Sequence, residues 1–154
     1  EIEKYLKERN ITDYEIVEKE QGSIPMTCYK FWKHNSKNII NIGTAGGWSK
    51  ASTGFTFKNT TRKTAKLITH IKQDKPLTEF HKIDKFWFYD LLLLDILSKK
   101  NHLGASIFAK MFQKNHPKKI LKFLDEETSL LEELQIELKM PPINFIKALF
   151  QRVF

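Results

Sequence analysis

Hydrophobic residues in the first third of the chain are spaced as in extended backbone. Residues 14–19 alternate well enough for a β-strand, and residues 38–42 contain a short apolar run. Residues 24–30 are also expected to be extended, because a proline at their second position disfavours helical backbone in the residue before it. A charged helix over residues 1–9, ended by Asn10, precedes these strands. The pattern therefore predicts a strand-rich beginning.

After residue 57 the apolar spacing becomes helical. Side chains recur three and four residues apart along residues 57–71 and mark one face of a helix. Further helices are predicted over residues 80–97 and 103–112, from residue 116, starting with the acidic residues 125–127, and over residues 143–153. The predicted fold class is α+β and predominantly helical. Residues 1–57 would form a strand-rich segment, and residues 58–154 a helical segment packed on it in one compact unit.

The composition is consistent with one domain and limits the cellular compartments in which it would be found. The chain has 154 residues, of which 41% are hydrophobic, so it can bury a core. It opens inside a helix without an initial methionine, and we expect it to be a piece of a longer protein. A single cysteine excludes an internal disulfide and fits a reducing compartment. No signal peptide is visible, and the longest apolar run, residues 86–97, is too short and too acidic to predict a membrane-spanning helix.

The formal net charge of +8 leaves three interpretations open. Nucleic acid or an anionic membrane surface would be attracted by it. A lysine-rich composition without any charged partner would also produce it. A basic helical module that binds nucleic acid remains an alternative, but no helix combines clustered arginine with the asparagine or glutamine that reads bases, so no specific nucleic-acid binding is predicted.

A glycine-rich turn is the most informative chemical feature of the chain. Three of the six glycines fall within residues 43–47, directly after the apolar run, and Gly54 follows a Ser-Thr pair before the predicted helix. Glycines can adopt positive φ and let a ligand approach the backbone, and Ser52 or Thr53 would cap a helix start that attracts anions. A purely structural turn is the alternative. Neither the G-x-G-x-x-G fingerprint nor a Walker A loop is present.

The residues of this turn carry a resemblance to a known family. Gly-Thr-Ala-Gly at residues 43–46, followed by Ser-Thr-Gly-Phe at residues 52–55, resembles the second flavin-binding motif of the lycopene cyclases. Ile-Pro-Met at residues 24–26 is similar to a segment that precedes this motif in the family, and the resemblance covers roughly residues 14–71. Thr44 stands where related aromatic hydroxylases and geranylgeranyl reductases carry aspartate, which favours the cyclases.

The chain also departs from the pattern of the family. Gly-Trp-Ser-Lys-Ala at residues 47–51 replaces a shorter stretch that carries a proline, and Phe55 replaces a tyrosine. The dinucleotide-binding motif that comes first in the family is absent, as is the upstream acidic motif that holds its proposed acid. The resemblance therefore implies the carboxyl-terminal piece of an α/β FAD-binding flavoprotein, whose N-terminal FAD-binding half is a partner. We expect this piece alone to be inactive.

The resemblance implies a reaction for the intact enzyme. An acid protonates a terminal alkene of linear lycopene, a β-ionone-type ring closes through a carbocation, and reduced FAD stabilises the cation without transferring electrons. A geranylgeranyl reductase or another FAD-dependent oxidoreductase acting on isoprenoids is the alternative within enzymes. The catalytic acid is not assigned. The predicted substrate contacts are Pro25 and Met26, and the predicted cofactor contacts are Gly43, Thr44, Ala45, Gly46, Gly47, Thr53, Gly54 and Phe55.

Two further stretches carry expectations. Residues 123–128 look like the acidic motif of the family but lie downstream of the turn, so they are interpreted as an acidic helix start with no catalytic role. Because lycopene lives in the bilayer, the resemblance implies a cytoplasmic enzyme at the membrane surface. The aromatic residues 86–88 would serve that contact or pack in the core. The five histidines are expected to be solvated or capping, with no metal site.

Overall fold

The computed structural model describes residues 1–140 and 142–153, and it confirms a predominantly helical fold. Short 3-10 helices lie at Phe31–His34 (η1), Gly43–Gly46 (η2), Leu77–Glu79 (η3) and Asn101–Leu103 (η4). The α-helices are α1 (Ile2–Glu8), α2 (Phe57–Lys72), α3 (Lys85–Lys100), α4 (Gly104–Lys114), α5 (Pro117–Leu124), α6 (Leu130–Glu137) and α7 (Pro142–Val153).

The strands predicted at residues 14–19, 24–30 and 38–42 are not seen, and the described residues contain no strand. A strand requires a neighbouring strand to satisfy its backbone. Within the described chain, residues 12–28 form no backbone–backbone hydrogen bond, and Val17 is 91% exposed. The apolar run instead enters a tight turn, in which the Ser36 N–H donates to the Ile39 carbonyl at 2.8 Å.

The helices after residue 57 match their predicted positions, with two shifts, at the starts of α3 and α6. Helix α3 begins five residues later than the pattern suggested, because the Asp84 side chain accepts a hydrogen bond from the Trp87 N–H at 3.0 Å and caps the helix. Ser129 and Glu132 form the reciprocal capping box that starts α6. Pro117 occupies the first turn of α5, where its missing N–H costs nothing.

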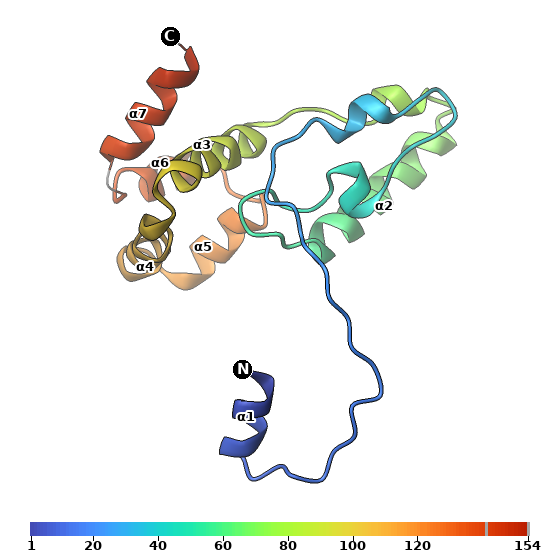
Figure 1. Cartoon of the computed structure of the whole chain (residues 1–154). Coiled ribbons are helices and arrows are strands. Elements are labelled where there is room, and N and C mark those ends of the chain that lie inside the picture. The colour runs from blue at the N-terminus through green and yellow to red at the C-terminus, as the bar shows by residue number, and fades with distance from the viewer. Residues whose placement is uncertain (141, 154) are drawn as a thin grey trace.

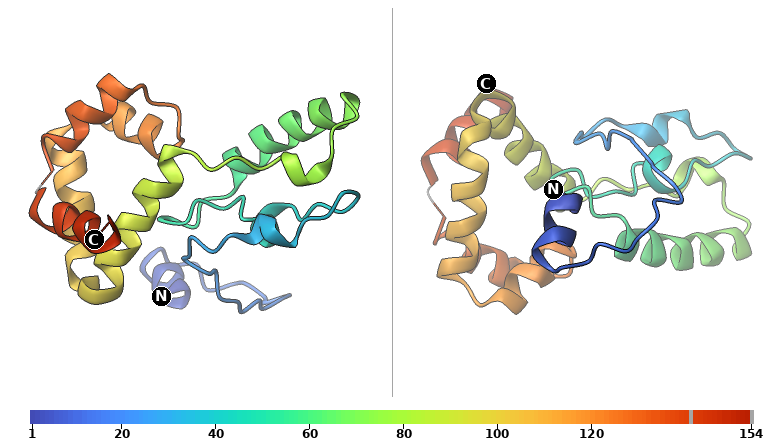
Figure 2. Two further views of the ribbon diagram at one scale, coloured as in Figure 1. Left: turned by 90° about the horizontal axis from the view of Figure 1, so that it is seen from above. Right: turned by 60° about the horizontal axis from the view of Figure 1, so that its bottom comes forward.

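Figures 1 and 2 show helices α4 to α7 gathered on one side of α3, and α2 with the loops before it on the other. Helix α3 packs against α7, and α4, α5 and α6 follow as sequential neighbours. Among the described residues, two clusters of buried side chains lie in the helical part, and the partly buried Met140 packs against both. They consist of Leu92, Ile96, Ile107 and Ala148, and of Met111, Ile120 and Ile136.

The N-terminal helix lies apart from this body. Figure 1 shows α1 joined to the rest by a long extended segment. The apolar side chains of Ile2, Tyr5 and Ile16 are at least half exposed. No helix in residues 1–140 or 142–153 is long and apolar enough to cross a membrane. The division of the chain at residue 57 stays a prediction.

Candidate functional site

The glycines of the turn are needed for two different physical reasons. Gly43 and Gly47 have φ angles of +59° and +67°, in the left-handed region that side chains with a Cβ rarely adopt. Gly46 is required by packing instead, since a Cβ there would overlap the carbonyl oxygen of Asn41. The Cβ position of Gly43 has no heavy atom within 4 Å, so space is open beside this residue.

The residues between this turn and α2 form a second turn and do not cap the helix. The Gly54 N–H donates to the Lys50 carbonyl at 2.8 Å, and the Lys50 N–H donates to the Phe55 carbonyl at 2.9 Å. This closed turn delays the helix, whose N-cap position is Thr56. The expected capping by Ser52 or Thr53 was therefore wrong.

The structure brings together the two sequence segments that carry the resemblance. A Cβ added at Gly54 would lie 3.4 Å from Ile24 Cγ2 and 3.7 Å from Met26 Sδ. Pro25 lines a cavity of about 640 Å³ together with Thr44 and Gly47. The other predicted contact residues are not among the described residues that line this cavity: Met26, Gly43, Ala45, Gly46, Thr53, Gly54 and Phe55.

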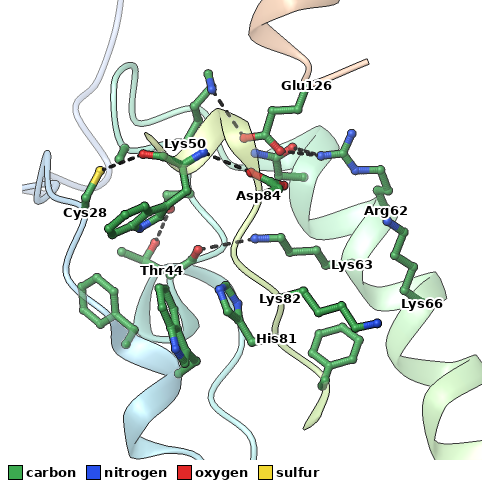
Figure 3. Close-up of a pocket in the computed structure, with 18 of the residues that line it drawn as sticks. Cys28, Thr44, Lys50, Arg62, Lys63, Lys66, His81, Lys82, Asp84 and Glu126 are labelled. Atoms are coloured by element: carbon green, nitrogen blue, oxygen red, sulfur yellow. Dashed lines mark hydrogen bonds and ion pairs between the residues drawn. The ribbon is translucent and has the colours of Figure 1, made fainter. Parts of the chain in front are cut away.

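A network of ion pairs crosses one wall of the cavity (Figure 3). The Lys50 side chain, only 3% exposed, lies 3.0 Å from Asp90 Oδ1 and 3.4 Å from Glu126 Oε1. Arg62 Nη2 donates to Glu126 Oε2 at 2.7 Å and to Asn59 Oδ1 at 2.9 Å. Residues from α2, the second turn, α3 and the α5–α6 loop therefore meet here. Hydrophobic periodicity could not indicate this network, because its members lie far apart along the chain.

Of the acidic residues 125–127, Glu126 belongs to this wall. None of the three starts a helix, so the interpretation of residues 123–128 as a helix start was wrong. Residues 125–127 lie after α5, and α6 begins only after Ser129. Their carboxylates find cations on α2 instead. Lys58 Nζ lies 2.6 Å from Asp125 Oδ2 and 3.1 Å from Glu127 Oε1.

Lys63 of α2 is a partly buried cation in the cavity wall. Its Nζ donates to the Gly47 carbonyl over a long 3.5 Å, and Figure 3 shows it pointing toward the turn. Burial lowers the pKa of Lys63, although Glu126 opposes this shift. The cavity thus contains an ammonium group that has lost much of its hydration without gaining a carboxylate at ion-pair distance among the described residues.

The imidazole of His81 stacks on the Trp32 ring, with the centroids 3.7 Å apart. Burial, together with the charge of Lys63, lowers the pKa of His81 to about 4, so the ring is neutral at pH 7. His81 therefore departs from the expectation that the histidines are solvated or capping. His116 agrees with it, because its Nδ1 accepts a hydrogen bond from the Lys118 N–H and caps α5.

The aromatic residues 86–88 pack inside the protein. Phe86 is 6% exposed and meets Phe123 edge-on, with the centroids 6.2 Å apart. Trp87 meets Trp32 edge-on, and Phe88 packs against the buried cluster around Leu92. Of the two interpretations left open for this stretch, the structure favours core packing.

Cys28 lies at the same cavity as a protonated thiol. Burial, aided by the charge of Asp90, raises its pKa to about 12. Its Sγ donates a weak hydrogen bond to the Trp87 carbonyl at 3.7 Å. A thiol held in this way is a poor nucleophile at neutral pH.

Comparison with known proteins gives one finding. The family described as lycopene cyclase protein matches residues 1–150, which is nearly the whole chain. Neither a curated protein nor a solved structure matches it.

Proposed function

The chain belongs to the lycopene cyclase family, and from this premise we propose that it is the carboxyl-terminal, flavin-facing part of an FAD-dependent enzyme that closes β-ionone-type rings at the ends of linear lycopene. The family match over residues 1–150 carries this proposal. Bound reduced FAD would supply negative charge that stabilises a cationic transition state. The chain itself would contribute binding and orientation.

The turn around Gly43 fits a flavin in part. Gly43 is in the left-handed conformation and has open space beside it, so a cofactor can approach its backbone. Thr44 and Gly47 line the neighbouring cavity. Gly46 has a packing reason of its own, and we therefore assign the flavin contact first to Gly43, Thr44 and Gly47. Ala45 and residues 53–55 would complete the turn around it.

Exposed apolar surface supports the partners we propose. Residues 12–28 form no backbone–backbone hydrogen bond with the described part of the chain and carry exposed apolar side chains, as expected of a segment that adds to the sheet of an FAD-binding half. Pro25 and Met26 of this segment would contact the substrate. On α6, Leu130, Leu131 and Leu134 are 52–74% exposed and would face an apolar partner such as the membrane surface that holds lycopene.

The test is an assay of the intact enzyme that contains this chain. Lycopene in liposomes is incubated with the enzyme and reduced FAD, and the products are identified by chromatography and mass. Cyclised product of unchanged mass is expected. Unchanged lycopene would contradict the proposal, and hydrogenated product with oxidation of a nicotinamide donor would favour the reductase alternative.

A variant of the turn extends this test. In Gly43→Ala the new methyl group meets no atom, but the φ of +59° strains any residue with a Cβ. Flavin affinity measured by fluorescence quenching is expected to fall severalfold. Gly22→Ala is the matched control, because its Cβ also meets nothing and its φ is not in the positive range. Equal flavin affinity of the two variants would remove Gly43 from the site.

A further inference from the structure

A second cavity, of about 350 Å³, lies among α3, α4, α6 and α7. Figure 2 shows these helices on the side of α3 away from the glycine turn. Leu92 and Ile107 of one buried cluster line this cavity, and so do Met111 and Ile136 of the other. Met140, which packs against both clusters, lines it as well. A domain usually has one contiguous core, so this cavity marks a place where the core is divided.

The lining of this apolar cavity offers few partners to water. Of the described residues that line it, only Tyr89, Asp90 and Glu137 have polar side chains. The Tyr89 hydroxyl already donates to Glu133 Oε2 at 3.1 Å, and Asp90 is paired with Lys50. A buried water needs two to four polar partners. Protein interiors contain few voids larger than a water molecule, and ligand pockets have volumes of about 300–1,000 Å³, so the cavity has the size of a ligand site.

The apolar cavity reaches the surface along α7 and contains no cation. Ile146 and Leu149 line it and are 46% and 38% exposed, so a ligand can enter beside them. The only charged side chains among its described lining residues are the acids Asp90 and Glu137. Burial, together with the charge of Glu133, raises the pKa of Glu137. These surroundings disfavour a further negative charge.

We infer that the apolar cavity binds a neutral hydrocarbon chain of roughly ten carbons, as in an alkyl or isoprenoid alcohol. A cavity of about 150 Å³ holds benzene, so about 350 Å³, part of it open to solvent, has room for a chain of this length. The flexible side chains of Met111 and Met140 allow the lining to adapt to the chain. The inference does not rest on the proposed function, because it uses no residue of the glycine turn.

The first experiment measures how affinity depends on chain length. Unbranched alcohols from 1-hexanol to 1-dodecanol displace the neutral fluorophore N-phenyl-1-naphthylamine from the protein. Affinity is expected to rise about threefold to fourfold for each added CH₂ up to 1-decanol, because each is buried from water. 1-Dodecanol should gain less than about twofold over 1-decanol, because the cavity is then full. No binding would overturn the inference, and so would a steady rise through 1-dodecanol, which indicates adsorption to exposed apolar surface.

A cavity-filling variant locates the site. Ile107→Phe places a larger side chain at a buried lining position, and it is expected to weaken 1-decanol binding about fourfold by displacing about one CH₂. Ile71→Phe is the matched control: it makes the same change at a 55% exposed position of α2 that lines neither cavity, and the affinity should not change.

A second variant keeps the test valid if Ile107→Phe does not fold, which circular dichroism and the melting temperature report. Leu149→Phe enlarges a side chain at the partly exposed rim, where there is room for it, and it should also weaken 1-decanol binding. Equal affinity of the folded lining variants and Ile71→Phe would overturn the inference.

Two further ligands test the charge and the source of the chain. Decanoate at pH 7 is expected to bind at least about tenfold more weakly than 1-decanol, because the described lining has two acids and no cation. Equal affinity of the two would overturn the assignment of a neutral ligand. Geraniol is a branched isoprenoid alcohol with as many carbons as 1-decanol. Tighter binding of geraniol would support the inference with an isoprenoid as the source, and tighter binding of 1-decanol would support it with an unbranched lipid chain.

Discussion

At the scale of single residues, burial and neighbouring charges set the protonation state of a polar side chain. His81 has lost much of its contact with water and stacks on Trp32, and Lys63 repels the proton that His81 would take up. Asp84 acts in the opposite direction but does not prevail. A histidine that looked solvated in the sequence is therefore held neutral by its surroundings.

This gives a prediction for the dependence of stability on pH. The pKa of His81 is 6.5 when unfolded and about 4 when folded, so below pH 6.5 the unfolded chain binds a proton that the folded chain does not. Stability contributed by the neutral ring is present above pH 6.5 and is lost as pH falls toward 4. In His81→Phe the drop in melting temperature between pH 7 and pH 5 is expected to be smaller than in the parent chain. His102→Phe, at an exposed position, should show the parental drop, and equal drops in all three proteins would refute the assignment.

At the scale of elements, one buried lysine connects segments that lie far apart along the chain. Lys50 reaches from the second turn to Asp90 on α3 and to Glu126 after α5, and Arg62 adds α2 to the same group. The apolar clusters lie elsewhere, among α3 to α7. These ion pairs therefore help to hold α2 against α3 and the loop after α5.

Removing the central cation should cost far more than removing a peripheral one. Lys50→Met leaves Asp90 buried without its counter-ion and is expected to lower the free energy of unfolding by about 3–5 kcal/mol. Lys58→Met breaks the ion pairs of a side chain that is 44% exposed, and it should cost far less than Lys50→Met. Urea denaturation measures both.

A double variant checks the cause of this loss. Lys50→Met combined with Asp90→Leu removes both charges of the buried pair, and it should recover part of the stability lost in Lys50→Met. No recovery, or equal costs for Lys50→Met and Lys58→Met, would show that the buried pair is not the cause.

At the scale of the whole molecule, the body and the N-terminal segment differ in how they are held. The body has buried clusters and cross-chain ion pairs, whereas residues 12–28 are extended and lack backbone partners within the described chain. Such a backbone adapts readily to the active site of a protease.

Trypsin should therefore cut first after Lys19, which lies in the middle of this segment. Mass spectrometry after brief digestion is expected to show residues 20–154 as the main early product. Its melting temperature should match that of the uncut chain, because α1 and the segment after it bury little apolar surface. Early cleavage within α3 or α4 instead would mean that the helical part is the less stable one.

The sequence by itself determined the helices and the turn. Each helix closes hydrogen bonds between residues four apart, so the apolar period placed the helices after residue 57 to within about five residues of their observed starts. The glycines at residues 43–47 likewise predicted a turn, because their conformation is a local property.

Only the tertiary structure decided the strands and the charged cavity. A strand depends on a neighbour that the pattern of one segment cannot specify, and residues 14–19 alternate whether or not that neighbour is beside them. Lys50 and Asp90 are 40 positions apart, and Lys63 and His81 are 18 apart. Their burial and their electrostatic interactions arise only when folding brings them to one cavity. The sequence alone does not distinguish a lysine in water from a lysine beside a buried carboxylate.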